Sequence, residues 1–251
     1  MDDKSEIIYG KNPVTELLKS KCAVDTVLVA DNLNPSVQSF YMALAKDCGA
    51  VVKKVHPLKL NTLCQTDSHQ GVAAYASTID YVSIESILAI AKEKGESPFV
   101  VICDGIEDPH NLGAIMRSAY LMGAHGLVIP KRNGVSVTGI VHKSSAGASM
   151  HLPVAKVANI AQAVRTLKDN NLFIYCADLK GQPLYKQNLT GAIGLVIGSE
   201  GDGVQTLVKS LCDGVVSIPM ANPNSGVDSY NASVAAGIIM YEIQRQRVLA
   251  K

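Results

Sequence analysis

The sequence predicts an α/β protein made of two segments, a small α/β/α sandwich followed by a larger parallel sheet. Short, continuous apolar runs such as "FVVICDGI" (residues 99–106) are typical of buried strands, and they alternate along the chain with stretches of helical spacing. Continuous apolar strands separated by amphipathic helices indicate a parallel sheet that is covered on both faces. A mixed stretch at residues 77–97, which includes one amphipathic helix and ends in charge and glycine, divides the two segments as a linker.

The first segment comprises residues 1–76. Its first helix is expected near residues 12–20, with Asn12 as a possible cap and Pro13 at the first helical position. The other expected elements are strands at 24–30, 50–55 and 71–77 and helices at 37–49 and 59–65. This order predicts a small sheet with helices on both faces.

The second segment comprises residues 98–251 and alternates strands with helices throughout. Strands are expected at 99–106, 126–130, 172–178, 192–198 and 214–220, and helices at 111–123, 159–170, 203–212 and from 231 onward. In open parallel sheets, ligands bind beyond the carboxyl ends of the strands. The loops that follow the strands are therefore the places to search for a site.

Composition narrows the class of protein. The chain has 23 basic and 22 acidic residues, so an anionic partner must meet a local basic patch rather than a global charge. The six cysteines show no metal-ligand spacing, and we expect buried reduced thiols and no metal site. The acidic start "MDDKSEIIYG" lacks the apolar core of a signal peptide, and no apolar run has the length of a membrane span, so we expect a cytosolic protein.

Three of the strand-following loops have unusual composition. In "EDPHNLGAIMR" after the first strand, Asp108 and Pro109 mark a turn, Asn111 is a possible helix cap, and Gly113 keeps the first helical turn narrow. Arg117 follows six residues later; a basic side chain near a helix start opposes the helix dipole, although a solvated surface arginine is the simpler interpretation.

The second loop, "GSEGDGV", has three glycines around Glu200. It lacks the Lys-Ser/Thr ending of a phosphate-binding loop, and its two carboxylates would repel phosphate. It therefore suits a neutral or cationic ligand held by backbone groups. In the third loop, before the last helix, one of Ser229 and Asn231 is explained as a helix cap. The small-residue face that follows, Ala232, Ala235, Ala236 and Gly237, indicates close helix packing or a dimer contact.

The three loops "DPHNLGAIMR", "IGSEGDGV" and "IPM…SYNASVAAGIIMYE", in this order, resemble the signature motifs of the SpoU/TrmH branch of the SPOUT methyltransferases. These are RNA ribose 2'-O-methyltransferases that use S-adenosylmethionine. "SSAGAS" and "LPV" at residues 144–154 are similar to the middle section of that family. The first segment, with "YGKNPV" and "HQGVAAYAS", resembles the RNA-binding domain of the RlmB-type members, which favours a guanosine of 23S ribosomal RNA as target.

The resemblance implies an α/β trefoil knot, in which the C-terminal chain threads an earlier loop, and an obligate homodimer whose sites are completed by the partner chain. It implies that Gly198, Ile218 and Met220 hold the adenine end of the cofactor, with Tyr230 at a position where the family usually has Leu. The loop at residues 221–228 is longer than usual for the family.

The resemblance also implies roles for the remaining motif residues. Arg117 is nearest the reacting hydroxyl, and because a guanidinium stays protonated we expect it to bind phosphate and stabilise negative charge on the ribose oxygen rather than act as a base. Asn111 and Asn231 would orient Arg117 or the ribose, Glu200 would fix the arginine or a loop, and Ser229 would help order the reacting groups.

The positions that match RNA contacts in the family are Lys11, Asn12, His69, Gln70, Arg245 and Arg247. Local explanations exist for four of them. His69 and Gln70 fit a turn at a strand entry, and the two arginines fit the favourable charge at a helix C-terminus.

Three rival functions stay open at this point. One is a tRNA rather than a ribosomal RNA target, and another is an RNA-binding relative that has lost catalysis. The third is a nucleotide-dependent α/β enzyme that uses "GSEGDG" for phosphates. Binding of the methyl donor separates the methyltransferase interpretations from the last two.

Overall fold

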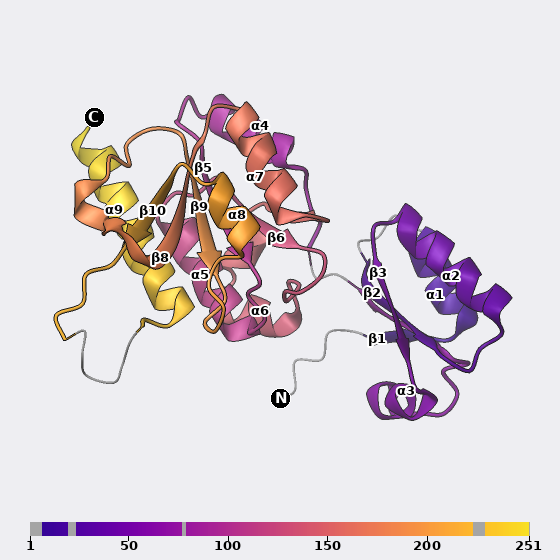
Figure 1. The fold of residues 1–251 in the computed structure, drawn as a ribbon. Coiled ribbons are helices and arrows are strands. Elements are labelled where there is room, and N and C mark those ends of the chain that lie inside the picture. Colours follow the sequence, from indigo (N-terminus) through magenta and orange to yellow (C-terminus); the bar gives the residue numbers. More distant parts are fainter. Residues whose placement is uncertain (1–6, 20–23, 77–78, 223–228, 251) are drawn as a thin grey trace. The chain divides into compact units, whose positions relative to one another are not determined.

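The computed structural model describes residues 7–19, 24–76, 79–222 and 229–250 (Figure 1). The chain divides into two compact units, one formed by Met1–Asp80 with Val137–Ile140 and the other by Tyr81–Ser136 with Val141–Lys251. Cys22 and residues 223–228 of the long loop before the last helix lie outside the described residues. Each unit is described below by itself.

The first unit is built on a four-stranded sheet of mixed direction. Its strand order is β1 (Ile7–Tyr9), β4 (Val72–Ala76), β2 (Val24–Ala30), β3 (Val51–Val55). Strand β2 runs parallel to β3, whereas β4 is antiparallel to both of its neighbours. The helices are α1 (Lys11–Lys19), α2 (Pro35–Asp47) and α3 (Pro57–Cys64).

Alternating side chains of β2 supply the cores on the two faces of this sheet. Val27 and Val29 pack in one cluster with Val14 of α1 and Tyr41 of α2. Leu28 and Ala30 pack in a second cluster with Leu60 and Cys64 of α3. Successive residues of a strand point to opposite faces, so one apolar strand serves both cores. The expected α/β/α sandwich is confirmed.

Two details of this unit differ from the sequence analysis. Strand β1 was not expected, and α1 begins at Lys11, so Asn12 lies inside the helix and is not its cap. Gly10, with φ of +97°, turns the chain from β1 into α1. The backbone N–H of Lys11 donates to the Gln70 side chain at 2.9 Å, so a residue 59 positions away supplies the hydrogen bond expected from a local cap.

The second unit is built on a six-stranded sheet in which every described pairing is parallel. The strand order is β10 (Gly214–Ser217), β8 (Phe173–Pro183), β9 (Ile193–Gly198), β5 (Phe99–Asp104), β6 (Gly126–Pro130), β7 (Val154–Val157). The central strands β5 and β9 are buried along their whole length. The expected parallel sheet is confirmed, and β7 is an addition that the sequence analysis did not assign as a strand.

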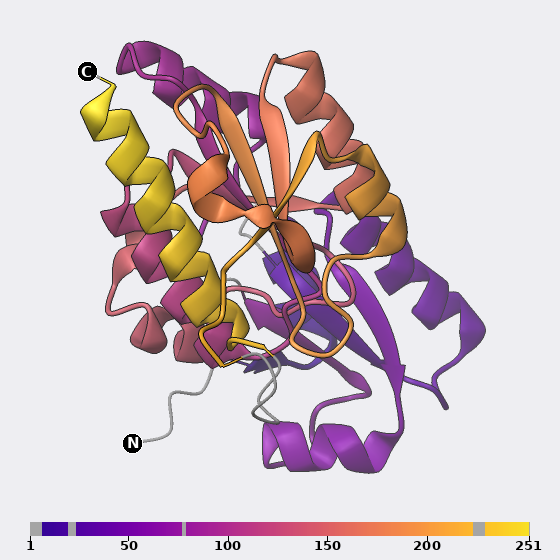
Figure 2. The same cartoon turned by 60° about the vertical axis from the view of Figure 1, so that its left-hand side comes forward.

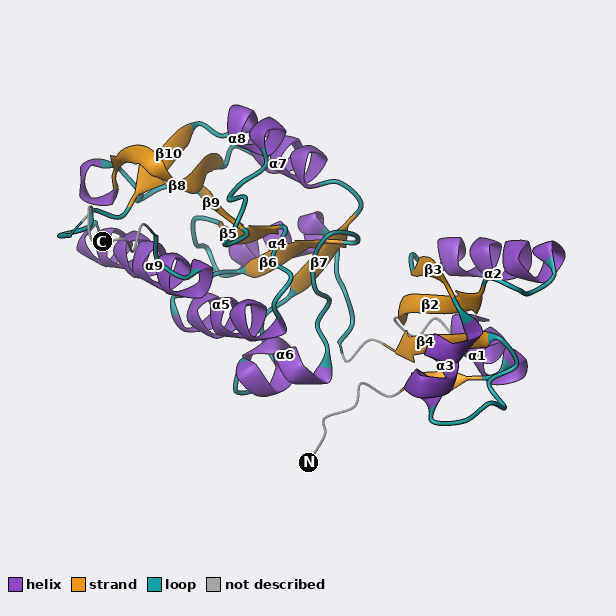
Figure 3. Cartoon of the chain, turned by 60° about the horizontal axis from the view of Figure 1, so that its bottom comes forward, coloured by secondary structure: helices purple, strands orange, loops and turns teal. Residues whose placement is uncertain are grey.

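Helices cover both faces of this sheet (Figure 3). On one face, α4 (Ile84–Glu93), α7 (Ile160–Asp169) and α8 (Thr206–Leu211) share a core cluster with side chains of β5 and β9. On the other face, α5 (Pro109–Leu121) packs beside α9 (Ala232–Leu249) (Figure 2). Short α6 (Gly139–Ser144) and the one-turn helices at Ala148–Met150 and Leu184–Lys186 complete the described elements.

Helix α4 has a different place from the one the sequence analysis gave it. It was assigned to a linker at residues 77–97, but Ile87 and Ala91 are fully buried and Ile87 belongs to the core cluster of the second unit. The apolar stripe of this helix therefore packs as part of the domain, as the stripe of an amphipathic helix normally does.

Strand β8 extends beyond the expected end at Asp178 and carries an interruption in its pairing. Consecutive residues Val215 and Val216 of β10 pair with Cys176 and Gln182 of β8. Residues 177–181 therefore interrupt the ladder as a bend of β8. This bend becomes one wall of the site described next.

Candidate active site

The loop after β9 is closed on itself by backbone hydrogen bonds. Ser199 and Gly203 exchange N–H···O bonds of 3.2 and 3.1 Å, and the Ser199 hydroxyl accepts the N–H of Asp202. Gly203 has a φ of +66°, a conformation that glycine adopts without strain. A Cβ atom at Gly198 would overlap the backbone of Gly203 and Val204. The loop can close this tightly only because residue 198 is glycine.

Asp104, at the end of β5, holds the loop after β9 in place through hydrogen bonds to Gln205. Its carboxylate accepts the backbone N–H of Gln205 at 2.8 Å and the side-chain amide of Gln205 at 3.0 Å. Asp104 is 1% exposed, and burial raises the pKa of its carboxyl, while the hydrogen bond from the Gln205 backbone acts in the opposite direction. Strand ends β5 and β9 are register neighbours, with Asp104 opposite Gly198, so the anchor lies directly beside the closed loop.

Asn111, Glu200 and Asn231 form a cluster that joins the three motif loops. The Asn111 amide donates to Glu200 at 3.1 Å, and the Asn231 amide donates to Asn111 Oδ1 at 3.0 Å and to the same Glu200 oxygen. These residues are separated by 89 and 120 positions in the chain. The Glu200 carboxylate is therefore held by two amide donors at the point where loops after β5 and β9 meet the start of α9.

Helix capping explains why Asn111 is free for this contact. The cap of α5 is Asp108, whose side chain accepts the N–H of His110 at 3.0 Å, and Pro109 is the first helical residue. The expectation that Asn111 caps this helix is wrong, because the preceding Asp-Pro pair already supplies the cap. Asn231 does cap α9, with its Oδ1 accepting from Ser233 and Val234, while its amide nitrogen faces Glu200.

Gly113 has the packing role that the sequence analysis gave it. A Cβ atom there would overlap the Ser144 hydroxyl, which itself donates to the Pro109 carbonyl at 3.2 Å. The first turn of α5 therefore lies directly against the end of α6, the region of the "SSAGAS" motif.

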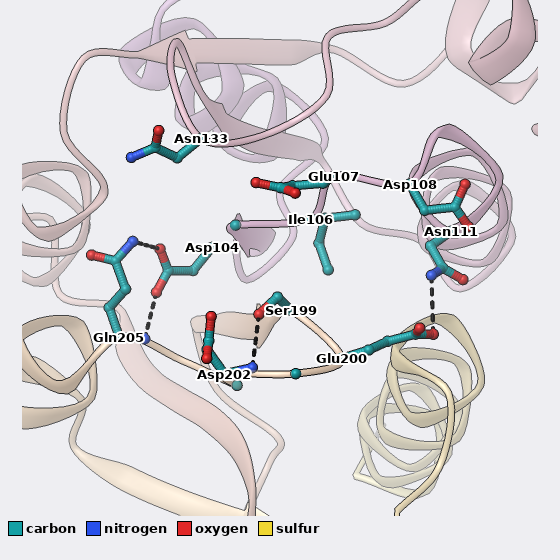
Figure 4. A pocket seen from close by; sticks show the side chains of 13 residues that line it. Asp104, Ile106, Glu107, Asp108, Asn111, Asn133, Ser199, Glu200, Asp202 and Gln205 are labelled. Carbon is teal, nitrogen blue, oxygen red and sulfur yellow. Dashed lines mark hydrogen bonds between the residues drawn. The ribbon is translucent and has the colours of Figure 1, made fainter.

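Two cavities share the Ser199–Gly203 loop as a common wall. We call the first the acidic cavity; it has a volume of about 620 Å³ and lies over the ends of β5 and β9 (Figure 4). Its lining is Asp104, Gly105, Ile106, Glu107, Asp108, Asn111, Asn133, Ser199–Gly203 and Gln205. Only Asn111 and Glu200 of the three-residue cluster line it.

We call the second the apolar cavity; its volume is about 380 Å³. It lies between the bend of β8, the closed loop, the end of β10 and the start of α9. Its apolar lining is Ala177, Leu179, Ile197, Val216, Ile218, Tyr230, Ala232, Ala235 and Ile239. At its margin Asp178 pairs with Lys209 at 2.7 Å, and this hydrogen bond lowers the pKa of the Asp178 carboxyl.

Comparison with protein families now decides the class of protein. Residues 98–241, which hold all three motif loops, match the family model described as SpoU rRNA Methylase family. Residues 7–82 match the model described as RNA 2'-O ribose methyltransferase substrate binding. The chain belongs to the SpoU/TrmH family of RNA methyltransferases.

Relatives of full length agree with this membership. A Bacillus subtilis (strain 168) protein, YacO, named for the TrmH family of tRNA/rRNA methyltransferases, is 41% identical over 249 residues, covering 98% of both chains. An uncharacterised tRNA/rRNA methyltransferase of Mycobacterium sp. (strain KMS) is 38% identical over 98% of this chain and 78% of its own.

Solved structures share the fold. The SpoU methyltransferase AviRb from Streptomyces viridochromogenes, crystallised in complex with the cofactor AdoMet, has a TM-score of 0.61 and 24% identity, covering 97% of this chain and 90% of its own. An AdoMet-bound rRNA methyltransferase from Sinorhizobium meliloti has a TM-score of 0.59 and 21% identity, covering 95% and 86%.

The SpoU motif residues expected at the cofactor lie mostly around the apolar cavity. Gly198, Ile218, Ser229 and Tyr230 line it, and Glu200 lines both cavities. Met220 follows Ile218 by two residues and is not part of either lining. The sequence analysis missed Asp104, Gln205 and the bend of β8. Asp104 could have been found, because it is a carboxylate at the end of the apolar run "FVVICD".

Arg117 is placed apart from the other expected catalytic residues. It is exposed on α5, and its side chain makes no hydrogen bond or ion pair with any other described residue. Six helical positions put it about 120° around the helix from Asn111. Glu200, which we expected to fix the arginine or a loop, accepts from the two asparagine amides and makes no hydrogen bond or ion pair with Arg117 among the described residues.

In the substrate-binding unit, the expected RNA contacts divide into exposed and buried groups. Lys11, Asn12 and Gln70 are exposed. His69 is 5% exposed; its Nδ1 accepts the N–H of Gly71 at 2.9 Å and its Nε2 lies 2.6 Å from Asn61 Oδ1. The His69 ring is thus held by the turn before β4 and by Asn61 of α3.

The two arginines near the end of α9 also differ from each other. Arg245 is exposed and forms a two-pronged ion pair with Glu242, both distances being 2.7 Å. Arg247 donates to the carbonyls of Ser97, Pro98 and Gly191 and lies over the Phe99 ring. Burial lowers the pKa of Arg247. Its guanidinium is partly buried and is occupied by these three carbonyls.

The described residues were also compared with the patterns of metal sites and membrane spans. Among the described residues, no group of three or more His, Cys, Asp or Glu side chains is arranged to hold a metal ion. None of the described helices combines the length and apolar character needed to cross a lipid bilayer.

A substitution at Asn231 separates its two roles. Asn231→Ser keeps a side-chain oxygen to cap α9 but removes the amide donor to Glu200 without adding a charge. We expect a loss of methyl transfer of about 10-fold or more, the size of one lost hydrogen bond to a charged group, with little change in thermal midpoint. Asn231→Ala removes both roles and is expected to lower both activity and thermal midpoint. If both variants lowered the thermal midpoint by the same amount, the cluster would have only a structural role.

Proposed function

We propose that this protein transfers a methyl group from S-adenosylmethionine to the 2'-hydroxyl of a ribose in RNA, and that the target is a guanosine of 23S ribosomal RNA in the cytoplasm. The observation that carries the proposal is the Asn111–Glu200–Asn231 cluster, which joins all three family motifs between two cavities. Solved relatives bind AdoMet on the same fold, which supports the choice of cofactor.

The apolar cavity has the chemistry that S-adenosylmethionine requires. Ile218, Ile197 and Val216 offer apolar contact for an adenine ring, and Gly198 exposes backbone at the cavity wall. Carboxylates of Asp178, Glu200 and Asp202 at the same lining favour the positive charges of a sulfonium and an ammonium group. When bound, the cofactor supplies an activated methyl group on sulfur. We assign Gly198, Ile218, Tyr230 and Ser229 to its binding, with Met220 next to them in sequence.

The residues of the chain contribute orientation and charge to the reaction. Asn111 and Asn231 hold the Glu200 carboxylate in one position, and we assign them the task of ordering the ribose. Arg117 is assigned to stabilise negative charge as the ribose hydroxyl loses its proton. A water or a phosphate oxygen takes that proton, because a guanidinium does not.

The position of Arg117 supports a homodimer in which each site is completed by the partner. Val234, Tyr241 and Val248 of α9 are 49%, 58% and 57% exposed, and Leu121 of α5 is 67% exposed. The three α9 positions are seven residues apart and share one side of the helix. A second copy packed against α5 and α9 would cover this apolar surface and bring Arg117 to the partner's ribose. We also assign the trefoil knot of the family to the second unit.

RNA binding is assigned to both units. We propose that residues 1–76 hold the RNA through Lys11, Asn12 and Gln70, and that residues 98–251, with helix α4 packed into their core, catalyse. Arg245 remains a candidate contact, since its guanidinium is exposed beside Glu242. Relatives are named as tRNA/rRNA methyltransferases, so a tRNA target is the second candidate.

Two measurements test this function. Calorimetric titration with S-adenosylmethionine is expected to give one site per chain. Mapping of ribose methylation in RNA from a strain lacking the protein is expected to show one 23S guanosine that has lost its methyl group. Absence of cofactor binding would refute catalysis, and a methyl group lost from tRNA instead would replace the ribosomal target.

A further inference from the structure

The acidic cavity has carboxylates that the fold does not use. Asp104 and Glu200 are occupied by Gln205 and the two asparagine amides. Glu107 and Asp202 also line the cavity, and their carboxylates make no hydrogen bond or ion pair with the rest of the described chain. Figure 4 shows the Glu107 side chain on the same side of the lining as Asn133, across from Ser199. The cavity therefore presents a free hydrogen-bond acceptor to whatever enters it.

Two cationic residues directly precede a lining residue of this cavity in the chain. Lys131 and Arg132 directly precede Asn133, a lining residue, and neither side chain has an ion-pair or hydrogen-bond partner in the described part of the chain. Their loop is held in place by the bonds Lys131 N–H to Val157 O, 2.7 Å, and Val135 N–H to Ile106 O, 2.8 Å. The second bond joins this loop to the segment that carries Glu107.

A nucleotide is the ligand that combines both features. Its phosphate requires cations and would be repelled from a carboxylate-lined interior, whereas its base can offer N–H donors to that interior. Of the four RNA bases, guanine presents two adjacent donors, N1–H and N2–H, on one edge. A carboxylate can accept both at once, as it does from an arginine fork.

We propose that the acidic cavity receives the guanine base of the target nucleotide, with the Glu107 carboxylate accepting its N1–H and N2–H while Lys131 and Arg132 hold a neighbouring phosphate. This assignment rests on the proposed function, because it needs the ribose to lie near the Asn111–Glu200–Asn231 cluster, beside the shared wall of the two cavities. The base leaves its stack to enter, as bases do in enzymes that act on single nucleotides. Glu107 is then a specificity-determining residue.

The test uses the purified full-length protein and a synthetic RNA that spans the mapped nucleotide, made with guanosine or with inosine at that position. Inosine keeps N1–H and lacks the N2 amine, so it removes one of the two donors. We expect the wild type to prefer guanosine over inosine by about 10- to 100-fold in kcat/KM, the range for a hydrogen bond to a charged group. In Glu107→Gln, which cannot accept both donors, the activity on guanosine falls and the preference approaches unity.

Glu93→Gln is the matched control, since Glu93 is exposed on α4 and the chemical change is the same. It is expected to keep the wild-type preference. Replacing both Lys131 and Arg132 with Gln is expected to lower the salt slope of RNA binding by roughly two phosphates, while Glu107→Gln leaves that slope unchanged.

The outcomes separate this proposal from the proposed function. If the wild type binds S-adenosylmethionine and methylates RNA, but Glu107→Gln keeps the full preference for guanosine, the base assignment is wrong and the function stands. Weaker binding of S-adenosylmethionine by Glu107→Gln would place the cofactor, not the base, in the acidic cavity. A wild type that neither binds the cofactor nor methylates RNA would refute both.

Discussion

Arg117→Ala is expected to abolish methyl transfer while leaving the affinity for S-adenosylmethionine and the thermal midpoint unchanged. The side chain is exposed and contacts no other described residue through a hydrogen bond or ion pair, so its removal leaves the fold of the chain intact. It also lies outside the lining of the apolar cavity, where we place the cofactor. Loss of one donor that stabilises developing negative charge typically lowers kcat by about 100- to 1,000-fold.

Arg117→Lys distinguishes charge from geometry. Lysine keeps the positive charge but lacks the planar fork that contacts two oxygens together. We expect it to recover only a small part of the activity. Single-turnover methylation, with the cofactor at saturation, is the measurement. Wild-type turnover in Arg117→Ala would remove this residue from the catalytic role.

Mixed dimers test whether Arg117 acts across the subunit boundary. Chains carrying Arg117→Ala are combined, by co-expression with two affinity tags, with chains carrying a defective cofactor cavity. In a mixed dimer one of the two sites then has both an intact cavity and the partner's arginine. Random pairing gives mixed dimers in half of the population, so about a quarter of wild-type activity is expected from two inactive variants. No recovery would mean that each arginine serves its own chain.

The strands and the strand-following loops were predictable because their signals are local. Apolar runs such as "FVVICD" and "IGLVIG" are buried on both sides wherever a parallel sheet places them. Two short strands were not predicted. β1 has three residues and β7 has four, and such short segments are too short to show a hydrophobic repeat. The bend in β8 was also invisible, because it depends on the register with β10, a strand more than thirty residues away.

The candidate site shows the same division. Glu200 and Asn231 were singled out from their loops, but their contact with each other and with Asn111 depends on strand order, which no local pattern contains. Asn111 was assigned a cap because Asn is a good cap. Asp108 took that role three residues earlier, which left the Asn111 amide for Glu200.

Gly198→Ala is expected to disrupt the cofactor site and weaken the binding of S-adenosylmethionine, whereas Gly201→Ala in the same loop is not. At position 198 the added methyl group would overlap backbone atoms of Gly203 and Val204, and backbone cannot turn aside as a flexible side chain can. The Ser199–Gly203 bonds must therefore open, and overpacking of this kind usually costs about 1–3 kcal/mol of stability. Because this loop walls both cavities, we expect the Kd for S-adenosylmethionine to rise by about 10-fold or more.

Gly201 provides the control for the chemical change itself. A Cβ atom there meets no other atom within 4 Å, and the φ of this residue lies outside the left-handed range that favours glycine. Gly201→Ala should therefore keep wild-type cofactor affinity and gain slightly in stability, by about 0.4–1 kcal/mol, because alanine restricts the unfolded chain. Urea unfolding and calorimetric titration of both variants measure the two effects. If both variants bound the cofactor like the wild type, the closed loop after β9 would not be the wall on which cofactor binding depends.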